Sequence, residues 1–483
     1  MKETLVLHPA PGFPQIVSMV ELGKQIIQHH PDFSITILVA STPSETSTTS
    51  SYIDLISNTN LSISFFSLPS IHPPPPPPPP NQDLHETQQR AALAFQSIRL
   101  NVPPVLDALR TISLSSSVLA IITSSNPFSD YDLIHIPIYF YITSCASALS
   151  FLLHLPTIYN QTSKSFKELN ETLLDIPGLP PIKASQMPQP MLHREDPGYH
   201  YFLDLGSRLP KLKGIIVNTF DSLEPHAIKA IADGACFPKG VVPPPLYCIG
   251  PLITDAKDRA GTSYDASSEC LAWLDGHPIR SVVFLCFGSR GKFSEAQLER
   301  MAYGLEMSNQ RFLWVVKSPD QGSITEPDLE VLLPKGFLER TKERALVVKS
   351  WAPQNAILRH ESVGGFVTHC GWNSVLEAVS YGVPMVAWPL YAEQHLNAVV
   401  LVEEMKLAIP IDTAKYNSKE GDKEEVLLVS AEEVEKKVRQ VMELEEGKVL
   451  RERSLDMRVM ATAARTKGGS SFTAFSKLLA SWK

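Results

Sequence analysis

The sequence predicts an α/β protein made of two doubly wound, Rossmann-like domains. Apolar, β-branched runs alternate with amphipathic helical stretches along the whole chain, a pattern typical of parallel sheets covered on both faces. The 483 residues suffice for two domains of ordinary size. A segment rich in proline and glycine, 237–255, separates two similar halves. We therefore expect two doubly wound domains that face each other across a cleft.

The first half opens with an apolar run, a Pro/Gly turn in LHPAPGFPQIVS (7–18), and a helix over 15–30. In that helix, apolar residues such as Ile16 and Val20 recur at helical spacing. The strands expected in this half are 3–9, 33–40, 61–67, 118–123, 136–144 and 214–219. A tight turn between a strand and a helix brings the backbone close to a ligand, so the 7–18 turn is expected to line the cleft.

The second half repeats the plan. The strands expected there are 281–288, 311–317, 345–350, 363–368 and 383–388, with helices near 294–309, 373–381 and 393–406. A further helix near 430–444 should begin with a capping box, because Ser430 is followed by Glu433.

Two segments lie outside this alternation. Residues 73–80 are eight consecutive prolines, and we favour an exposed polyproline II loop there over a ligand for an SH3-type domain. The segment 413–427 is charged and aperiodic, which predicts a mobile surface loop.

Composition narrows the class of protein. Hydrophobic residues make up 43% and charged residues 19%, and the formal net charge is −8 with no basic block. Nucleic acid and acidic membrane surfaces are therefore unexpected partners. The six cysteines, at positions 145, 236, 248, 270, 286 and 370, form no C-x-x-C pair, so we expect no structural zinc site and read them as reduced, buried thiols.

The chain shows no signal of a membrane location. The N-terminus has no basic region followed by a long apolar core, and no run reaches the ~18 apolar residues that span a bilayer. The expectation from sequence is a cytoplasmic monomer without an integral membrane segment.

The most informative stretch is 351–394, WAPQNAILRHESVGGFVTHCGWNSVLEAVSYGVPMVAWPLYAEQ. Its central part predicts a strand, a glycine turn and a helix that begins near Asn373. A helix N-terminus presents unpaired N–H groups and a partial positive charge, which favour an anion. His369 and Ser374 add donors there, and Glu393 and Gln394 close the stretch with groups suited to sugar hydroxyls.

This 44-residue stretch resembles the signature box of plant glycosyltransferases that transfer a sugar from UDP to small secondary metabolites. The resemblance extends over essentially the whole chain, including CIGPL at 248–252 and CFGSRGKFS at 286–294. VSMVELGK, near the N-terminus, looks like the branch that acts on flavonoids, chalcones and other phenols. No G-x-G-x-x-G is present, so a nicotinamide dehydrogenase is not supported.

The resemblance implies a GT-B fold with an acceptor-binding domain over 1–245 and a UDP-sugar-binding domain over 246–465. The last helix, 466–483, would pack back on the first domain. It further implies an inverting transfer of glucose from UDP-glucose to a phenolic small molecule, with no cofactor and no metal. Both substrates would meet at the cleft wall formed by the 7–18 turn.

The resemblance also assigns roles to individual residues. Trp351 would stack on the uracil ring with Gln354 nearby, and Glu377 would accept hydrogen bonds from the ribose diol. The residues implied to hold the diphosphate are His369, Asn373, Ser374 and Ser289. Those implied to contact the sugar are Trp372, Glu393, Gln394 and Thr143. Each role suits the residue: a flat ring for a base, a carboxylate for paired hydroxyls, and neutral donors for phosphate oxygens.

The catalytic base of the family is missing from its usual position. There, a histidine at the start of the first helix takes the proton of the acceptor, and an aspartate orients it. Aligned on VSMVELGK, the histidine position falls on Gln15, an amide that cannot accept a proton at neutral pH. The aspartate position falls on Ser129, with Asp130 adjacent as the tentative partner. His8, inside the first strand, is read as a structural residue.

Three consequences of this replacement are open from sequence. The acceptor is acidic enough to arrive partly ionised, another residue such as Asp130 supplies the base, or the protein binds UDP-sugar and phenolic ligands without efficient turnover. O-glucosylation and C-glucosylation of an activated ring both tolerate a weak base, so both remain open. The resemblance also implies UDP-glucose as the donor. Gln394 occupies the position where family members that use UDP-galactose tend to carry histidine. Trp372 occupies the position where members that use UDP-glucuronic acid carry a cationic residue.

Overall fold

The computed structural model describes residues 2–40, 46–69, 93, 95–125, 135–254, 264–319, 326–412, 414–417 and 425–482. The chain forms two compact units. Unit 1 comprises 1–254, 391–396 and 461–483, and unit 2 comprises 255–390 and 397–460. The chain passes between the units at four points, and two of these lie inside helices: α15 (Gln394–Glu403) and α17 (Glu445–Arg465).

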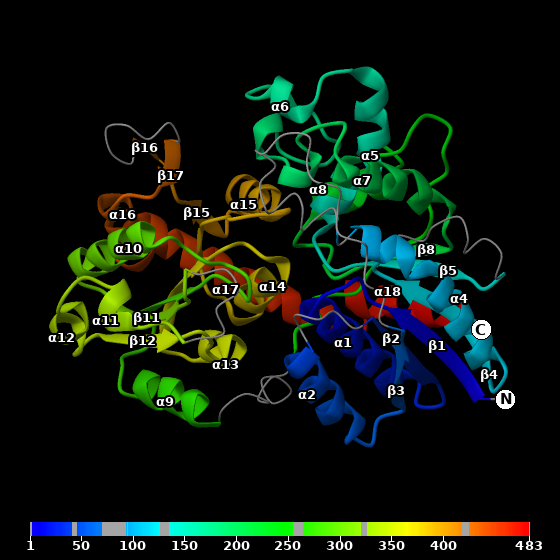
Figure 1. The fold of residues 1–483 in the computed structure, drawn as a ribbon, viewed down its shortest axis with the longest axis horizontal. Coiled ribbons are helices and arrows are strands. Elements are labelled where there is room, and N and C mark those ends of the chain that lie inside the picture. Colours follow the sequence, from blue (N-terminus) through cyan, green and yellow to red (C-terminus); the bar gives the residue numbers. More distant parts are fainter. Residues whose placement is uncertain are drawn as a thin grey trace. The chain divides into compact units, whose positions relative to one another are not determined.

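Unit 1 is built on a seven-stranded parallel sheet in the order β3-β2-β1-β4-β5-β8-β9 (Figure 1). Its strands are β1 (Lys2–His8), β2 (Ser34–Ala40), β3 (Ile63–Leu68), β4 (Ser116–Thr123), β5 (Ile138–Ile142), β8 (Gly214–Val217) and β9 (Leu246–Cys248). A two-stranded antiparallel pair, β6 (Leu173–Leu174) and β7 (Ile182–Lys183), lies outside this sheet. From β1 the chain first builds outward through β2 and β3, and it then returns to the other side of β1 with β4.

The sheet of unit 1 is buried on both faces. In β1, Leu5 and Leu7 pack in one core cluster while Val6 packs in another, because successive side chains of a strand point to opposite faces. The helices of unit 1 are α1 (Phe13–His29), α2 (Thr46–Ser57), α4 (Val102–Ser113), α5 (Ala146–Gln161), α6 (Phe166–Leu169), α7 (Pro197–Arg208), α8 (Pro225–Ala232) and α18 (Ser470–Ala480). Helix α18, red in Figure 1, packs Phe475 into the same cluster as Leu5.

Unit 2 carries a six-stranded parallel sheet in the order β12-β11-β10-β13-β14-β15. Its strands are β10 (Val282–Cys286), β11 (Arg311–Val316), β12 (Ala345–Lys349), β13 (Val363–Thr368), β14 (Met385–Ala387) and β15 (Ala408–Pro410). Its helices are α9 (Tyr264–Asp275), α10 (Glu295–Ser308), α11 (Leu329–Leu332), α12 (Phe337–Thr341), α13 (Gln354–Arg359), α14 (Trp372–Tyr381) and α16 (Ala431–Met442). Helices α10 and α16 pack their apolar sides on one face, around Trp314.

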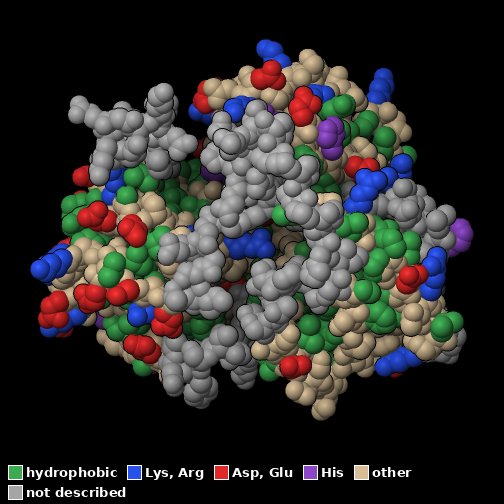
Figure 2. Space-filling view, viewed as in Figure 1, with side chains coloured by type: hydrophobic (Ala, Val, Ile, Leu, Met, Phe, Trp, Pro, Cys, Tyr) green, Lys and Arg blue, Asp and Glu red, His purple; other side chains and the backbone are tan. Residues whose placement is uncertain are grey.

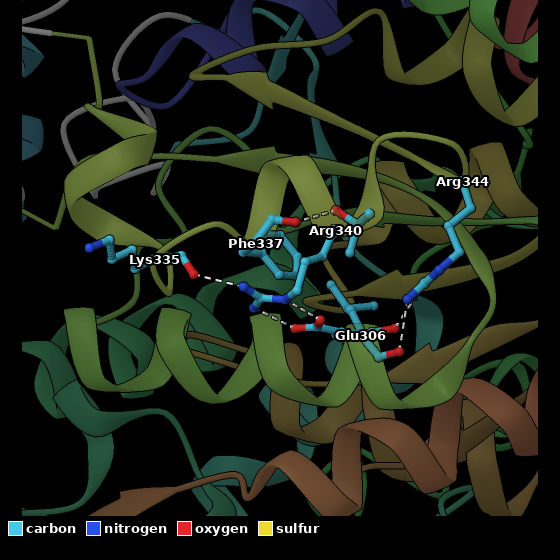
Figure 3. A network of polar contacts seen from close by, with 7 residues as sticks. Glu306, Lys335, Phe337, Arg340 and Arg344 are labelled. Carbon is cyan, nitrogen blue, oxygen red and sulfur yellow. Dashed lines mark hydrogen bonds and ion pairs between the residues drawn. The ribbon is translucent and has the colours of Figure 1, made fainter.

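One end of α10 is held by a polar network (Figure 3). The Arg344 guanidinium donates to Glu306 O and Gln310 O, at 2.8 and 2.9 Å, and so adds side-chain hydrogen bonds to carbonyl groups at and just beyond the helix end. The Glu306 carboxylate in turn accepts two hydrogen bonds from Arg340 of α12, at 2.6 and 2.9 Å. The network therefore joins α10, α12 and the start of β12.

The alternating elements expected from sequence are present in both units, with ends shifted by a few residues. The short strands β9 and β15 were not expected. The prediction of a loop over 413–427 is wrong in part, because β16 (Ala414–Asn417) and β17 (Glu425–Leu428) form an antiparallel pair. A backbone ladder of four residues needs no hydrophobic periodicity, so the pattern could not reveal it. The prolines of 73–80 lie outside the described residues.

The start of α16 is capped only partly as expected. Ser430 Oγ accepts a hydrogen bond from Glu433 N at 3.2 Å, which confirms the N-cap. The Glu433 carboxylate, however, accepts from Asp412 N at 3.0 Å instead of reaching back to the cap. A tertiary contact has thus taken the second half of the predicted capping box.

Other expectations concern the surface and the thiols. All six cysteines are free and buried, as predicted. Figure 2 shows acidic and basic side chains interspersed on the visible face. Among the described helices, none combines the length and the apolar character that a bilayer crossing requires.

Candidate functional site

In each sheet, the connections identify a point where ligands bind. An open parallel sheet binds its ligand at the carboxyl ends of the strands, where the strand order reverses. In unit 2 this point lies between β10 and β13, and in unit 1 it lies between β1 and β4. Among the described residues, those singled out by sequence follow the carboxyl ends of strands in these two sheets.

In unit 2, the loop after β13 places His369, Cys370 and Gly371 directly before α14. Cys370 adopts a left-handed conformation with φ 63°, and Gly371 is the N-cap of α14 without any side-chain cap. Trp372, Asn373 and Ser374 therefore form the first turn of the helix, as the sequence predicted to within one residue. A helix start carries a partial positive charge and N–H groups that point away from the helix, which is the physical basis for the anion site expected there.

The His369 ring is held between two glycines of neighbouring loops. A Cβ atom at Gly288, which has φ +70°, would lie 2.5 Å from His369 Nε2, and one at Gly371 would lie equally close. Only glycine at both positions leaves room for the ring. Burial, and secondarily the charge of Lys317, lowers the pKa of His369 to about 4. The ring is therefore neutral at pH 7, and among the described residues its Nδ1 has no hydrogen-bond partner.

Gln354 joins α13 to α14. Its Nε2 donates to Ser374 Oγ at 2.9 Å and to Glu377 Oε2 at 2.7 Å. Glu377 is fully buried on α14, where the bond from Gln354 offsets part of the cost of burying a carboxylate. The structure thus brings together three of the predicted donor-binding residues. Trp351 precedes α13 and is half-buried, while Ser289, after β10, is exposed.

In unit 1, three strand ends converge on Gln15. This residue lies in the first turn of α1, whose N-cap is Gly12. The amide oxygen Oε1 accepts from Thr143 Oγ1, after β5, at 2.9 Å and from Ser124 Oγ, after β4, at 3.3 Å. Ser124 Oγ itself accepts from Ala10 N at 2.9 Å, so its proton is available to Gln15. Two hydroxyls therefore occupy the amide oxygen.

Of the remaining predicted residues of unit 1, the structure describes Glu393 and Gln394 but not Asp130. Glu393 Oε1 accepts from Ser144 Oγ at 3.2 Å, which places it beside the loop that carries Thr143. Gln394 is buried and its Oε1 accepts from Tyr391 N at 3.0 Å. Asp130 lies outside the described residues.

His8 is a structural residue, as expected. It is 6% exposed at the end of β1, its Nδ1 lies 3.3 Å from Thr123 Oγ1, and burial lowers its pKa to about 4.

Sequence reasoning missed several residues that build these sites. Ser124 positions Gln15, and Glu224 holds the N-terminus of α5 by accepting from Ala146 N and Ser147 N at 2.8 and 2.9 Å. Helix α5 directly follows the loop that carries Thr143 and Ser144. Ser124 follows an expected strand, but its importance depends on the order of strands in the sheet, which periodicity does not reveal.

Comparison with known proteins agrees with this reading. Residues 249–426 match the family described as UDP-glucoronosyl and UDP-glucosyl transferase. The chain is 47% identical over 491 residues to phloretin 2'-O-glucosyltransferase of Malus domestica, covering 98% of each chain. It is 43% identical over 498 residues to anthocyanidin 5,3-O-glucosyltransferase of a Rosa hybrid cultivar, covering 100% of this chain and 99% of that one.

The fold comparison extends over the same length. The structure of Phytolacca americana UGT2, complexed with UDP-2fluoro-glucose and pterostilbene, is 34% identical, covers 99% of both chains and superposes with a TM-score of 0.82. The predicted GT-B class with two doubly wound Rossmann-like domains is confirmed. By sequence identity over its whole length and by fold, the chain belongs to the family of plant UDP-glycosyltransferases.

Proposed function

We propose that this UDP-glycosyltransferase transfers glucose from UDP-glucose to a phenolic small molecule such as a flavonoid or chalcone, with inversion at the anomeric carbon. The observation that carries the proposal is the geometry at the start of α14, where His369 is fixed between Gly288 and Gly371. Relatives named for phloretin and anthocyanidin glucosylation support the acceptor class.

The donor would bind at the carboxyl edge of the sheet of unit 2. Trp351 would stack on the uracil, and Glu377, already bonded to Gln354, would accept from the ribose hydroxyls. Ser289, His369, Asn373 and Ser374 would hold the diphosphate, and Trp372, Thr143, Glu393 and Gln394 would contact the sugar. Unit 2 is thus proposed as the nucleotide-sugar domain and unit 1 as the acceptor domain. Donors preorganised at the helix start would stabilise the negative charge of UDP as it leaves.

Gln15 would act on the acceptor as a hydrogen-bond donor. Because Thr143 and Ser124 occupy its amide oxygen, the group left to contact a substrate is Nε2, with two N–H donors. Such a donor stabilises an anionic phenolate oxygen and does nothing to remove a proton from a neutral hydroxyl. The acceptor would therefore lose its proton to solvent and bind as the phenolate. Its oxygen then attacks the anomeric carbon while the bond to the diphosphate breaks and its electron pair leaves with UDP.

An acceptor screen tests this function. The purified protein is incubated with UDP-glucose and a panel of phenols and aliphatic alcohols, and products are read by mass spectrometry. We expect hexosides of acidic polyphenols and little product from alcohols. UDP-galactose and UDP-glucuronic acid should be poorer donors than UDP-glucose, and a clear preference for either would contradict the assignment of the donor. Resistance of the product to acid hydrolysis separates C-glucosides from O-glucosides.

A further inference from the structure

Lys317 is a cation placed beside the proposed diphosphate site. It directly follows β11, which is the neighbour of β10 in the sheet. Its ammonium donates to the backbone oxygen of Gly288, in the loop after β10. Its charge also acts on His369, after β13. Lys317 thus lies where the carboxyl ends of three adjacent strands meet.

Among the described residues, no carboxylate compensates the charge of Lys317. Burial lowers the pKa of Lys317; the neighbouring Cys286 thiol raises it, and the charge of Lys292 lowers it again. In the part of the chain that the structure describes, no carboxylate forms an ion pair with this ammonium; its hydrogen bond goes to Gly288 O. A half-buried charge with a neutral partner alone is poorly compensated, and an anion would supply what is missing.

The residues that the proposed function assigns to the diphosphate are neutral. His369 is uncharged at pH 7, because its pKa lies at about 4. It is 6% exposed, and no described residue bonds to its Nδ1. Asn373, Ser374 and Ser289 carry no charge, so these four residues offer hydrogen bonds to a diphosphate without neutralising it.

We propose that Lys317 binds the diphosphate of the nucleotide sugar, and of the UDP product, through its ammonium group. This inference rests on the proposed function, since it places the diphosphate at the carboxyl edge of unit 2. An ammonium has three N–H donors; one is used by Gly288 O, which leaves two for phosphate oxygens. The same bond to Gly288 holds the ammonium against the loop that carries Ser289.

Calorimetric binding of uridine, UMP and UDP tests the proposal. In Lys317→Met, we expect the affinity for UDP to fall about 10- to 100-fold, the range for losing a hydrogen bond to a charged group. The affinity for uridine should change by less than about twofold, with UMP between the two. Lys317→Arg should retain most of the affinity for UDP. Lys317→Gln keeps a hydrogen-bond donor for Gly288 O but removes the charge, so its affinity for UDP should match that of Lys317→Met. If Lys317→Met fails to fold, Lys317→Gln takes its place in the test.

The matched control is Lys335→Met, which removes the same charge from an exposed position of unit 2. It should bind UDP like the wild type. If the wild type binds UDP and both Lys317→Met and Lys317→Gln bind it equally tightly, the role of Lys317 is overturned while the proposed function stands. Equal losses for uridine and UDP would also overturn it, because they would show a structural effect on the loop of Gly288. A wild-type protein that binds no UDP would overturn the proposed function as well.

Discussion

At the scale of single residues, the role proposed for Gln15 predicts how the acceptor is activated. Its amide is held by Thr143 and Ser124 with the oxygen occupied, and no proton acceptor is left on the side chain. A positioned general base contributes ~10²–10⁴ in rate, so the proposed replacement of such a base by Gln15 would have a measurable consequence. The fraction of ionised acceptor should set the rate.

The pH profile of kcat/KM should therefore follow the pKa of the acceptor and shift when the acceptor is changed. Acidic phenols should far outpace simple alcohols. Steady-state kinetics with three phenols of different acidity, measured from pH 5 to 9, checks this. One apparent pKa near 6–7, shared by all acceptors, would reveal an enzyme base and refute the role given to Gln15.

Two substitutions extend this prediction. Gln15→His should help weakly acidic acceptors most, by about tenfold or more if the ring is oriented. Gln15→Leu removes the donor and should lower kcat/KM with acidic phenols about 10- to 100-fold. Gln28→Leu, on the exposed end of the same helix, is the matched control and should leave the rate unchanged. Rates for Gln15→Leu equal to the wild type would show that Nε2 does not contact the acceptor.

His369 is the second residue with a testable role. Its replacement by alanine should nearly abolish turnover, at a cost of about 2–4 kcal/mol in transition-state stabilisation, by comparison with oxyanion donors. His360→Ala provides a control in the same unit, because His360 bonds to Asp275 at 3.1 Å, outside the proposed site. Initial rates measured over a range of UDP-glucose concentrations give kcat/KM for the comparison. Near-wild-type kcat/KM for His369→Ala would place the diphosphate elsewhere.

At the scale of elements, the close packing of α10 on α16 depends on Gly304. A Cβ atom at this position would lie 2.5 Å from Ala431 O and 2.6 Å from the Cβ of Val434. Alanine stabilises a helix by up to about 1 kcal/mol relative to glycine, whereas forcing an extra methyl into a packed contact costs about 1–3 kcal/mol. The steric cost of the extra methyl group should therefore exceed the gain in helix propensity.

We therefore expect Gly304→Ala to lower the free energy of unfolding of unit 2. Urea unfolding followed by tryptophan fluorescence is a suitable measurement. Gly276→Ala is the matched control, because its Cβ would meet only Trp273 O, at 3.4 Å. Stabilisation by Gly304→Ala would mean that the two helices move apart at little cost.

At the scale of the whole molecule, each unit contains a buried neutral histidine, His8 in unit 1 and His369 in unit 2. Burial lowers both pKa values from 6.5 to about 4. Below pH 6.5 each of these histidines is protonated in the unfolded chain, whereas in the folded chain it stays neutral down to about pH 4. Stability is therefore complete above pH 6.5 and falls as the pH drops toward 4, by on the order of 3 kcal/mol for each histidine.

Hydrogen exchange measured at pH 7 and pH 5, with correction for the intrinsic rates, should show this loss in β1 and in β13 separately. In His8→Asn, which keeps a polar partner for Thr123 without a titrating ring, the loss in β1 should be reduced while that in β13 persists. A wild-type protein with equal stability at both pH values would contradict the buried, neutral state of these rings.

Much of the fold could be predicted from the sequence because its cause is local. The parallel strands of β1 and β10 are buried on both faces, so they appear as continuous apolar runs, and helices such as α1 show the 3.6-residue period. The three-residue strands β9 and β15 and the pair β16–β17 could not be predicted, since such short segments carry no period of their own. The order of the strands in each sheet could not be predicted from the sequence either.

The sequence by itself determined the family, the two doubly wound domains and the helix start that carries Trp372, Asn373 and Ser374, because these depend on residues close together in the chain. The tertiary structure alone decided which distant groups act together. Ser124 and Thr143 occupy the oxygen of Gln15 from strands more than 100 positions away, and Lys317 reaches Gly288 across adjacent strands. The physical reason is that hydrogen bonding and burial depend on distance in space, which the order of strands in a sheet determines and the spacing of residues along the chain does not.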